Sequence, residues 1–183
     1  MKAIVYLATG FEEAEAVVPV DMMRRAGIDV DISSIDEEKA VTSSHGLTLL
    51  ADMTVSESDG NEYDIVFLPG GMPGAINLSQ SWSVNQRIIK MAAEGKIVSA
   101  ICASPSVVLA NAGLLEGRKA TCYPGCESYS AKDDFLPDGV VVDGNIITGK
   151  SAAYGFELSL KIIEAAISKE KADDTASAVY YER

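Results

Sequence analysis

Residues 97–104 read Ile-Val-Ser-Ala-Ile-Cys-Ala-Ser, and this stretch decides the fold. Its first five residues form an apolar run of strand length, and the segment 104–112 that follows has a helical composition. Cys102 therefore lies where a buried strand turns into a helix. Ala100 and Ser104 stand two residues before and after it, and a tight strand-to-helix turn requires such small side chains. The pattern predicts a nucleophile elbow with Cys102 at its apex.

The same alternation of strand-length apolar runs and helical segments continues in both directions from this stretch. Such alternation is typical of βαβ units, and it predicts an α/β fold with a doubly wound, mostly parallel sheet. The polar tail from Lys169 onward is expected to pack loosely. The expected strands are 3–8, 28–32, 63–68, 97–101, 119–123, 140–142 and 146–148, with a hairpin over 41–54, and the expected helices are 13–26, 84–94, 104–112 and 154–168.

The composition excludes several classes of protein. The chain has 183 residues, 48% hydrophobic and 23% charged, which predicts a single globular domain over residues 1–183. The net charge of −12 argues against nucleic acid and anionic membranes as partners. No run approaches the ~18 apolar residues of a membrane span, and an odd count of three cysteines argues against a secreted disulfide scaffold. We expect a cytoplasmic protein.

Two interpretations of Cys102 follow from the local pattern. At a helix N-terminus, the dipole and the backbone N–H groups favour a thiolate, so the thiol pKa is expected below the free value of about 8.5. Alternatively, Cys102 is a small buried hydrophobe at a strand end, which is a common role of free cysteine. The pattern by itself leaves both open.

An acidic segment follows the first expected strand: Gly10-Phe11-Glu12-Glu13-Ala14-Glu15. We interpret Glu12 and Glu13 as side chains that stabilise the helix dipole in a first turn. Glu15 is a candidate site residue, because it follows a strand end, as do Gly70-Gly71 and Cys102. In a doubly wound sheet such ends line one crevice, so these residues are expected to converge.

The segment Pro69-Gly70-Gly71-Met72-Pro73-Gly74 lacks the spacing of a nucleotide-binding loop. It is either a simple turn or a loop whose backbone N–H groups approach an oxyanion beside Cys102. A metal site built from Cys122, Cys126 and His45 is disfavoured, because the spacing matches no common zinc pattern and a fourth ligand is missing. We expect no metal, and we place His45 at the surface or at the rim of a cleft.

Taken together, these motifs resemble the ThiJ/PfpI superfamily, whose fold is class I glutamine amidotransferase-like, in the branch of the parkinsonism-associated deglycase and its YajL-like bacterial relatives. The likeness covers nearly the whole chain. The motifs that carry it are Glu12-Glu13-Ala14-Glu15, Pro19-Val20-Asp21, Arg24-Arg25-Ala26-Gly27, Leu68-Pro69-Gly70-Gly71, Ala100-Ile101-Cys102-Ala103 and Gly155-Phe156-Glu157.

The resemblance implies a flavodoxin-like α/β/α sandwich of three layers and a homodimer. It implies an oxidation-prone Cys102 with Glu15 hydrogen-bonded to it, and oxyanion-binding N–H groups on Gly71 and Ala103, with Gly70 in the same loop. It also implies that Arg25 lies near the dimer-side edge of the cleft. No cofactor is implied.

One departure from the family pattern concerns Tyr123, which stands before Pro124 where many relatives place a histidine that faces the cysteine. A Cys-His dyad is therefore absent from that position. Protease-like relatives carry a histidine directly after the nucleophile, where this chain has Ala103, and the His-x-Glu of amidotransferase relatives is missing as well. Peptidase activity is thus disfavoured.

The resemblance implies a cofactor-independent cysteine enzyme of the glyoxalase III or deglycase type, acting on 2-oxoaldehydes such as methylglyoxal or on their adducts. Cys102 would add to the aldehyde, and Glu15 would move the proton on the adjacent carbon. The alternative is a redox-sensing or chaperone-like stress protein that uses oxidation of Cys102, and Tyr123 shifts weight toward it. A third hypothesis is an interaction module without chemistry.

Overall fold

A computed structural model describes residues 1–130 and 133–182. Seven strands form the central sheet in the order β5-β2-β1-β6-β7-β9-β8, and all neighbours are parallel except β8, which runs antiparallel to β9. The strands of this sheet are β1 (Lys2–Leu7), β2 (Asp29–Ser34), β5 (Met53–Thr54), β6 (Ile65–Leu68), β7 (Ile97–Ile101), β8 (Val140–Asp143) and β9 (Ile146–Gly149). Its five central parallel strands follow the order 2-1-3-4-5 along the chain, which is the flavodoxin-like arrangement.

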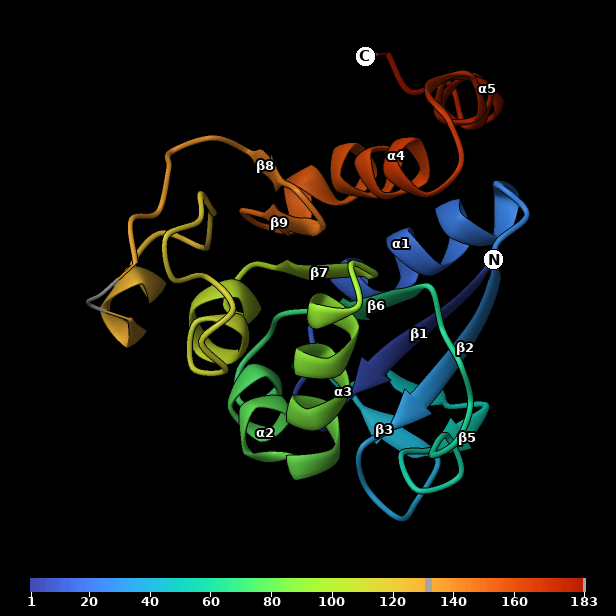
Figure 1. Cartoon of the computed structure of the whole chain (residues 1–183). Helices are drawn as coiled ribbons and strands as arrows, with labels where there is room; N and C mark the ends of the chain where they lie inside the picture. The colour runs from blue at the N-terminus through green and yellow to red at the C-terminus, as the bar shows by residue number, and fades with distance from the viewer. Residues whose placement is uncertain (131–132, 183) are drawn as a thin grey trace.

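Helices cover both faces of the sheet, as Figure 1 shows. Because parallel strands are buried on both sides, alternate residues of β1 enter two separate cores. Val5 and Leu7 pack toward α1, α4 and α5, whereas Ile4 and Tyr6 pack toward α2, α3 and η1. The helices are α1 (Glu13–Arg25), α2 (Gly74–Gln80), α3 (Trp82–Ala93), α4 (Gly155–Ala166) and α5 (Lys169–Ala178), with short segments η1 (Pro105–Leu109), η2 (Cys126–Tyr129) and η3 (Ala152–Tyr154).

This arrangement confirms the predicted α/β/α sandwich with a doubly wound, mostly parallel sheet. The chain leaves β1 toward β2 on one side and returns to β6 on the other, so the strand order reverses between β1 and β6. The loops after β1, β6 and β7 therefore meet at one edge of the sheet, where ligands bind in folds of this kind. None of the helices within the described residues is long and apolar enough to cross a membrane.

The expected strand 119–123 is wrong. Ala120 forms only an isolated bridge with Phe135, because β9 is already paired with β7 on one side and β8 on the other. The segment instead donates N–H groups singly: Thr121 to the Thr148 hydroxyl (3.0 Å) and Tyr123 to the Cys102 carbonyl (2.8 Å).

The expected hairpin over 41–54 is confirmed only in part. β3 (Ala40–Thr42) and β4 (Thr48–Leu50) pair antiparallel, but β5 leaves the hairpin and extends the main sheet beside β2. The expected helix 104–112 is shorter and wider, because the Ala110 N–H donates to the Pro105 carbonyl five residues back. The helix α2 follows the glycine loop and was not expected from the sequence.

The loose packing expected for the tail from Lys169 is also wrong. Residues 169–178 form α5, and Ala172, Thr175 and Ala176 on it are buried. Small side chains let this helix approach α4 closely. A segment whose average composition is polar therefore still packs one face against the core.

Candidate active site

The strand β7 delivers Cys102 into an elbow, as predicted. Cys102 has φ 65, in the left-handed region that residues other than glycine seldom adopt. Hydrogen bonds to two neighbouring segments hold this backbone, because the Cys102 N–H donates to the Gly149 carbonyl (2.8 Å) and its carbonyl accepts from Tyr123. The Ser104 hydroxyl donates to the Pro69 carbonyl (2.5 Å) and so ties the elbow to the glycine loop. The strained geometry leaves the thiol partly exposed at the edge of the sheet.

The glycine loop after β6 packs against this elbow without room for a side chain. A Cβ on Gly70 would lie 2.5 Å from both the Cys102 Cβ and a Glu15 carboxyl oxygen. Gly71 has φ +90, and a Cβ there would collide with the backbone of Glu12. These contacts require glycine at both positions, and the role of the loop as a provider of N–H groups to an oxyanion stays a prediction.

Glu15 lies in the first turn of α1, and only 1% of it is exposed. The Gly70 N–H donates to Glu15 Oε2 (3.0 Å), and the backbone of Ala152 lies near the same carboxyl group and lowers its pKa. The Glu15 carboxyl group and Cys102 lie on the same side of Gly70, where an added Cβ would meet both residues, and their side chains interact. The expected convergence of Glu15, Cys102 and the two glycines is therefore present in the structure.

Burial controls the protonation of this pair. It raises the pKa of Glu15 to about 7, and the charge of Glu12 adds to this shift. Burial also raises the pKa of the Cys102 thiol, and the facing Glu15 carboxylate raises it further, whereas the N–H groups of Gly71 and Ala103 lower it. The thiol pKa expected from the helix N-terminus alone was thus wrong in direction, because two N–H groups do not outweigh burial and a nearby negative charge. Near neutral pH the thiol keeps its proton, whereas Glu15 titrates, so the carboxylate form of Glu15 is present and can act as a base.

A pocket of about 400 Å³ opens over the thiol. Its lining residues are Glu12, Glu15, Gly71, Cys102, Tyr123, Ser151, Ala152 and Ala153. Tyr123 forms part of the pocket wall, and 48% of it is exposed. Arg25 lies at the far end of α1, where it pairs with Asp21 (2.7 Å), and it does not line the pocket of its own chain. Its place beside a partner's cleft remains a prediction.

Sequence reasoning missed two parts of this pocket. Glu12 does stand at the start of α1, as the dipole interpretation holds, but its side chain also lines the pocket. The segment 151–153 follows the carboxyl end of β9, and that position was the signal that could have identified it. Residues at these two places form the wall that a substrate meets beside the thiol.

His45 lies at the rim, as expected, and contacts acidic side chains rather than cysteines. Its Nδ1 is 3.2 Å from Glu13 and 3.4 Å from Glu12, and the negative charges raise its pKa. These three side chains bring possible ligand atoms within 4.8 Å of one another, but His45 is 68% exposed and ordinary ion pairing accounts for the cluster. Cys122 is 3% exposed and packs in the core, and Cys126 lies four residues later, at the start of η2.

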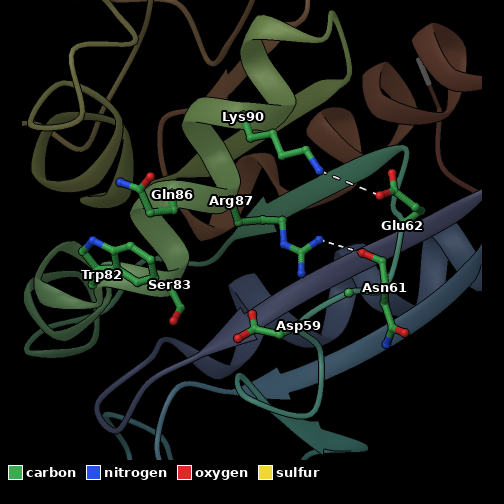
Figure 2. Close-up of a pocket in the computed structure, with 9 residues that line it drawn as sticks. Asp59, Asn61, Glu62, Trp82, Ser83, Gln86, Arg87 and Lys90 are labelled. Atoms are coloured by element: carbon green, nitrogen blue, oxygen red, sulfur yellow. Dashed lines mark hydrogen bonds and ion pairs between the residues drawn. The ribbon is translucent and has the colours of Figure 1, made fainter.

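A second hollow lies beside α3, around the exposed Trp82 (Figure 2). The two basic side chains in its lining are already engaged: Arg87 donates to the carbonyls of Asn61 (2.7 Å) and Ser58 (2.9 Å), and Lys90 Nζ lies 3.8 Å from Glu62 Oε1. Among the described residues that line this hollow there is no cysteine and no histidine. The pocket over Cys102 is the better candidate for chemistry.

Comparison with known proteins agrees with this geometry. Residues 1–165 match the model of the DJ-1/PfpI family. Protein DJ-1 homolog B of Arabidopsis thaliana is 35% identical over 172 residues, which are 93% of this chain and 39% of that protein, so the chain spans less than half of this relative. The deglycase PH1704 of Pyrococcus horikoshii is 35% identical over 161 residues, 84% of this chain and 92% of that protein.

The solved structures include oxidized DJ-1 of Toxoplasma gondii, which is similar to this chain with a TM-score of 0.96 and 36% sequence identity. The match covers 100% of this chain and 99% of that one. The similarity therefore extends over the whole sandwich, including the loops that build the pocket.

Proposed function

The chain belongs to the DJ-1/PfpI family, and from this premise we propose that it is a cofactor-independent cysteine enzyme acting on 2-oxoaldehydes such as methylglyoxal, or on their adducts. The observation that carries the proposal is the pairing of Cys102 with Glu15, a buried carboxyl group whose pKa of about 7 suits a general base. The similarity to a named deglycase supports the same class of reaction.

The first step joins the sulfur of Cys102 to the aldehyde carbon. Glu15 takes the thiol proton as the C–S bond forms, so no free thiolate is required despite the raised thiol pKa. The carbonyl oxygen gains negative charge beside the N–H groups of Gly71 and Ala103, and it then accepts the proton from Glu15. The product is a hemithioacetal, and Glu15 is again a carboxylate.

The second step moves a proton between adjacent carbons. Glu15 removes the proton from the former aldehyde carbon, which gives an enediol, and it then delivers a proton to the former ketone carbon. In the same step the hydroxyl proton passes from the former aldehyde oxygen to the former ketone oxygen. The result is a thioester of Cys102 with a 2-hydroxy acid. Water cleaves this thioester and restores the thiol, so the sum is addition of one water to the 2-oxoaldehyde, which gives lactate from methylglyoxal.

The test is lactate formation from methylglyoxal in the absence of glutathione. We expect activity in the wild type, loss of at least about a hundredfold in Cys102→Ser and in Glu15→Gln, and little change in Cys126→Ser, which serves as the matched thiol control. Equal rates for wild type and Cys102→Ser would refute the proposal.

A second candidate function, redox sensing or a chaperone-like stress role, is favoured by one observation. Cys102 is a partly exposed thiol in an elbow whose counterpart structure from Toxoplasma gondii is described as oxidized. Mass spectrometry after treatment with hydrogen peroxide separates the two: oxidation of Cys102 without any turnover of 2-oxoaldehydes would support the redox role.

A further inference from the structure

The pocket over Cys102 carries acidic groups without basic ones. Glu12 and Glu15 line it, and among the described residues of its wall there is no lysine, arginine or histidine. The remaining lining residues contribute hydroxyl groups, methyl groups and backbone. A molecule that approaches the thiol therefore meets carboxylate charge, and Glu12 is the more outward of the two because Glu15 is 1% exposed.

Contacts on several sides fix the Glu12 carboxylate at this position. The Ser44 hydroxyl donates to Glu12 Oε2 (3.1 Å), and His45 Nδ1 lies 3.4 Å from the same oxygen. The Glu12 backbone N–H donates to the Gly70 carbonyl (2.9 Å), which ties the residue to the loop beside the thiol. The side chain is 21% exposed, so water screens its charge only in part.

Glu13 provides a comparison within the same segment. It also contacts His45, at 3.2 Å, and its side chain is 23% exposed, yet it does not line the pocket. These two neighbouring carboxylates have similar burial, and only Glu12 lines the pocket over the thiol.

We propose that Glu12 is a specificity-determining residue, which makes the site select neutral carbonyl compounds and electrophiles against anionic ones. The physical reason is repulsion between its carboxylate and an anionic group carried by the reactant, in a partly desolvated pocket whose described lining contains no basic side chain. His45 contacts the same carboxylate from outside this lining and offsets part of its charge. For turnover this inference rests on the proposed function. The charge discrimination itself applies to any reagent that reaches Cys102.

The first experiment uses two alkylating agents of similar size. Iodoacetamide is neutral and iodoacetate is anionic, and mass spectrometry of the Cys102 peptide gives the rate of alkylation by each. We expect the ratio of the two rates, divided by the same ratio for free 2-mercaptoethanol, to favour iodoacetamide in the wild type. Glu12→Gln should lower this ratio by about tenfold, because one nearby negative charge is lost, and Glu13→Gln should leave the ratio unchanged.

The second experiment compares turnover of 4,5-dioxopentanoate, an anionic 2-oxoaldehyde, with that of its neutral methyl ester. The wild type should prefer the ester, and Glu12→Gln should shift the ratio of kcat/KM toward the anion, whereas Glu13→Gln should not. If neither compound turns over while the alkylation ratio behaves as expected, the proposed function fails and the charge selectivity stands.

Two results would overturn the inference. One is a wild-type alkylation ratio equal to that of 2-mercaptoethanol, a measurement that needs no variant and so does not depend on folding of Glu12→Gln. The other is an equal fall of the ratio in Glu12→Gln and Glu13→Gln, which would assign the effect to the general acidity of the surface. As a further check, rising salt concentration should shrink the wild-type preference.

Discussion

At the scale of single residues, Glu15 shows how the fold prepares a group for chemistry. A carboxyl group in water loses its proton near pH 4.5, but in this site burial moves the pKa to about 7. The sequence pointed to a lowered pKa for Cys102, which the structure contradicts because the carboxylate faces the sulfur in a buried place. The two side chains must therefore be read as one titrating pair.

The raised pKa of Glu15 predicts how stability depends on pH. Because the folded state binds this proton more tightly than the unfolded state, its contribution is fully present below pH 4.5 and is lost as the pH rises toward 7. A shift of this size corresponds to about 3 kcal/mol. The free energy of unfolding of the wild type, minus that of Glu15→Gln, should fall by about this amount between pH 4.5 and 8, as urea titrations can measure. Parallel curves for the two proteins would contradict the prediction.

At the scale of secondary structure elements, local patterns predicted the central strands and the elbow correctly, but they failed for the segment 119–123 and for the C-terminal helix α5. The strand β7 and the turn at Cys102 follow from an apolar run and from small residues at two fixed places. The segment 119–123 has the composition of a strand, but β9, whose Thr148 it contacts, is already paired on both sides. The helix α5 was missed as a packed element because its buried residues are alanine and threonine rather than large apolar side chains.

The burial of α5 gives a second prediction. Ala176 is 3% exposed against the core, whereas Ala178, two residues later on the same helix, is exposed. Ala176→Asp should lower the free energy of unfolding by about 2–4 kcal/mol, because it buries a charge without a partner. Ala178→Asp, the matched control, should cost less than about 1 kcal/mol. Equal, small effects in chemical denaturation would show that α5 is loosely attached.

At the scale of the whole molecule, the expected homodimer needs an exposed apolar face, and the helix α1 carries several apolar side chains. Val20 and Met23 prove to be buried in the core of their own chain, so their replacement would test folding rather than assembly. Val17 is different, because 45% of it is exposed beside a small hollow of about 180 Å³ that Leu49 also lines. A homodimer through this face of α1 and β4 remains a proposal, and the observation that supports it is the exposed side chain of Val17.

The dimer is tested by the mass of the protein in solution. Sedimentation equilibrium at micromolar concentration should give about twice the chain mass of 19.4 kDa. Val17→Glu should shift the protein toward monomer, while Val142→Glu should not, although Val142 on the edge strand β8 is equally exposed at 48%. A wild-type protein that sediments as a monomer would refute the assembly.

The sequence by itself determined the alternation of strands and helices, the elbow at Cys102 and the set of loops that follow parallel strands. These depend on periodicity and on small residues at fixed spacings, which are local properties of the chain. Only the tertiary structure decided which of two adjacent glutamates faces the pocket, Glu12 or Glu13, and that the backbone of Ala152 lies near the Glu15 carboxyl group. The same holds for the direction of the thiol pKa. The physical reason is that burial, hydrogen-bond partners and charge separation depend on distances between segments far apart in the sequence, and no local pattern contains those distances.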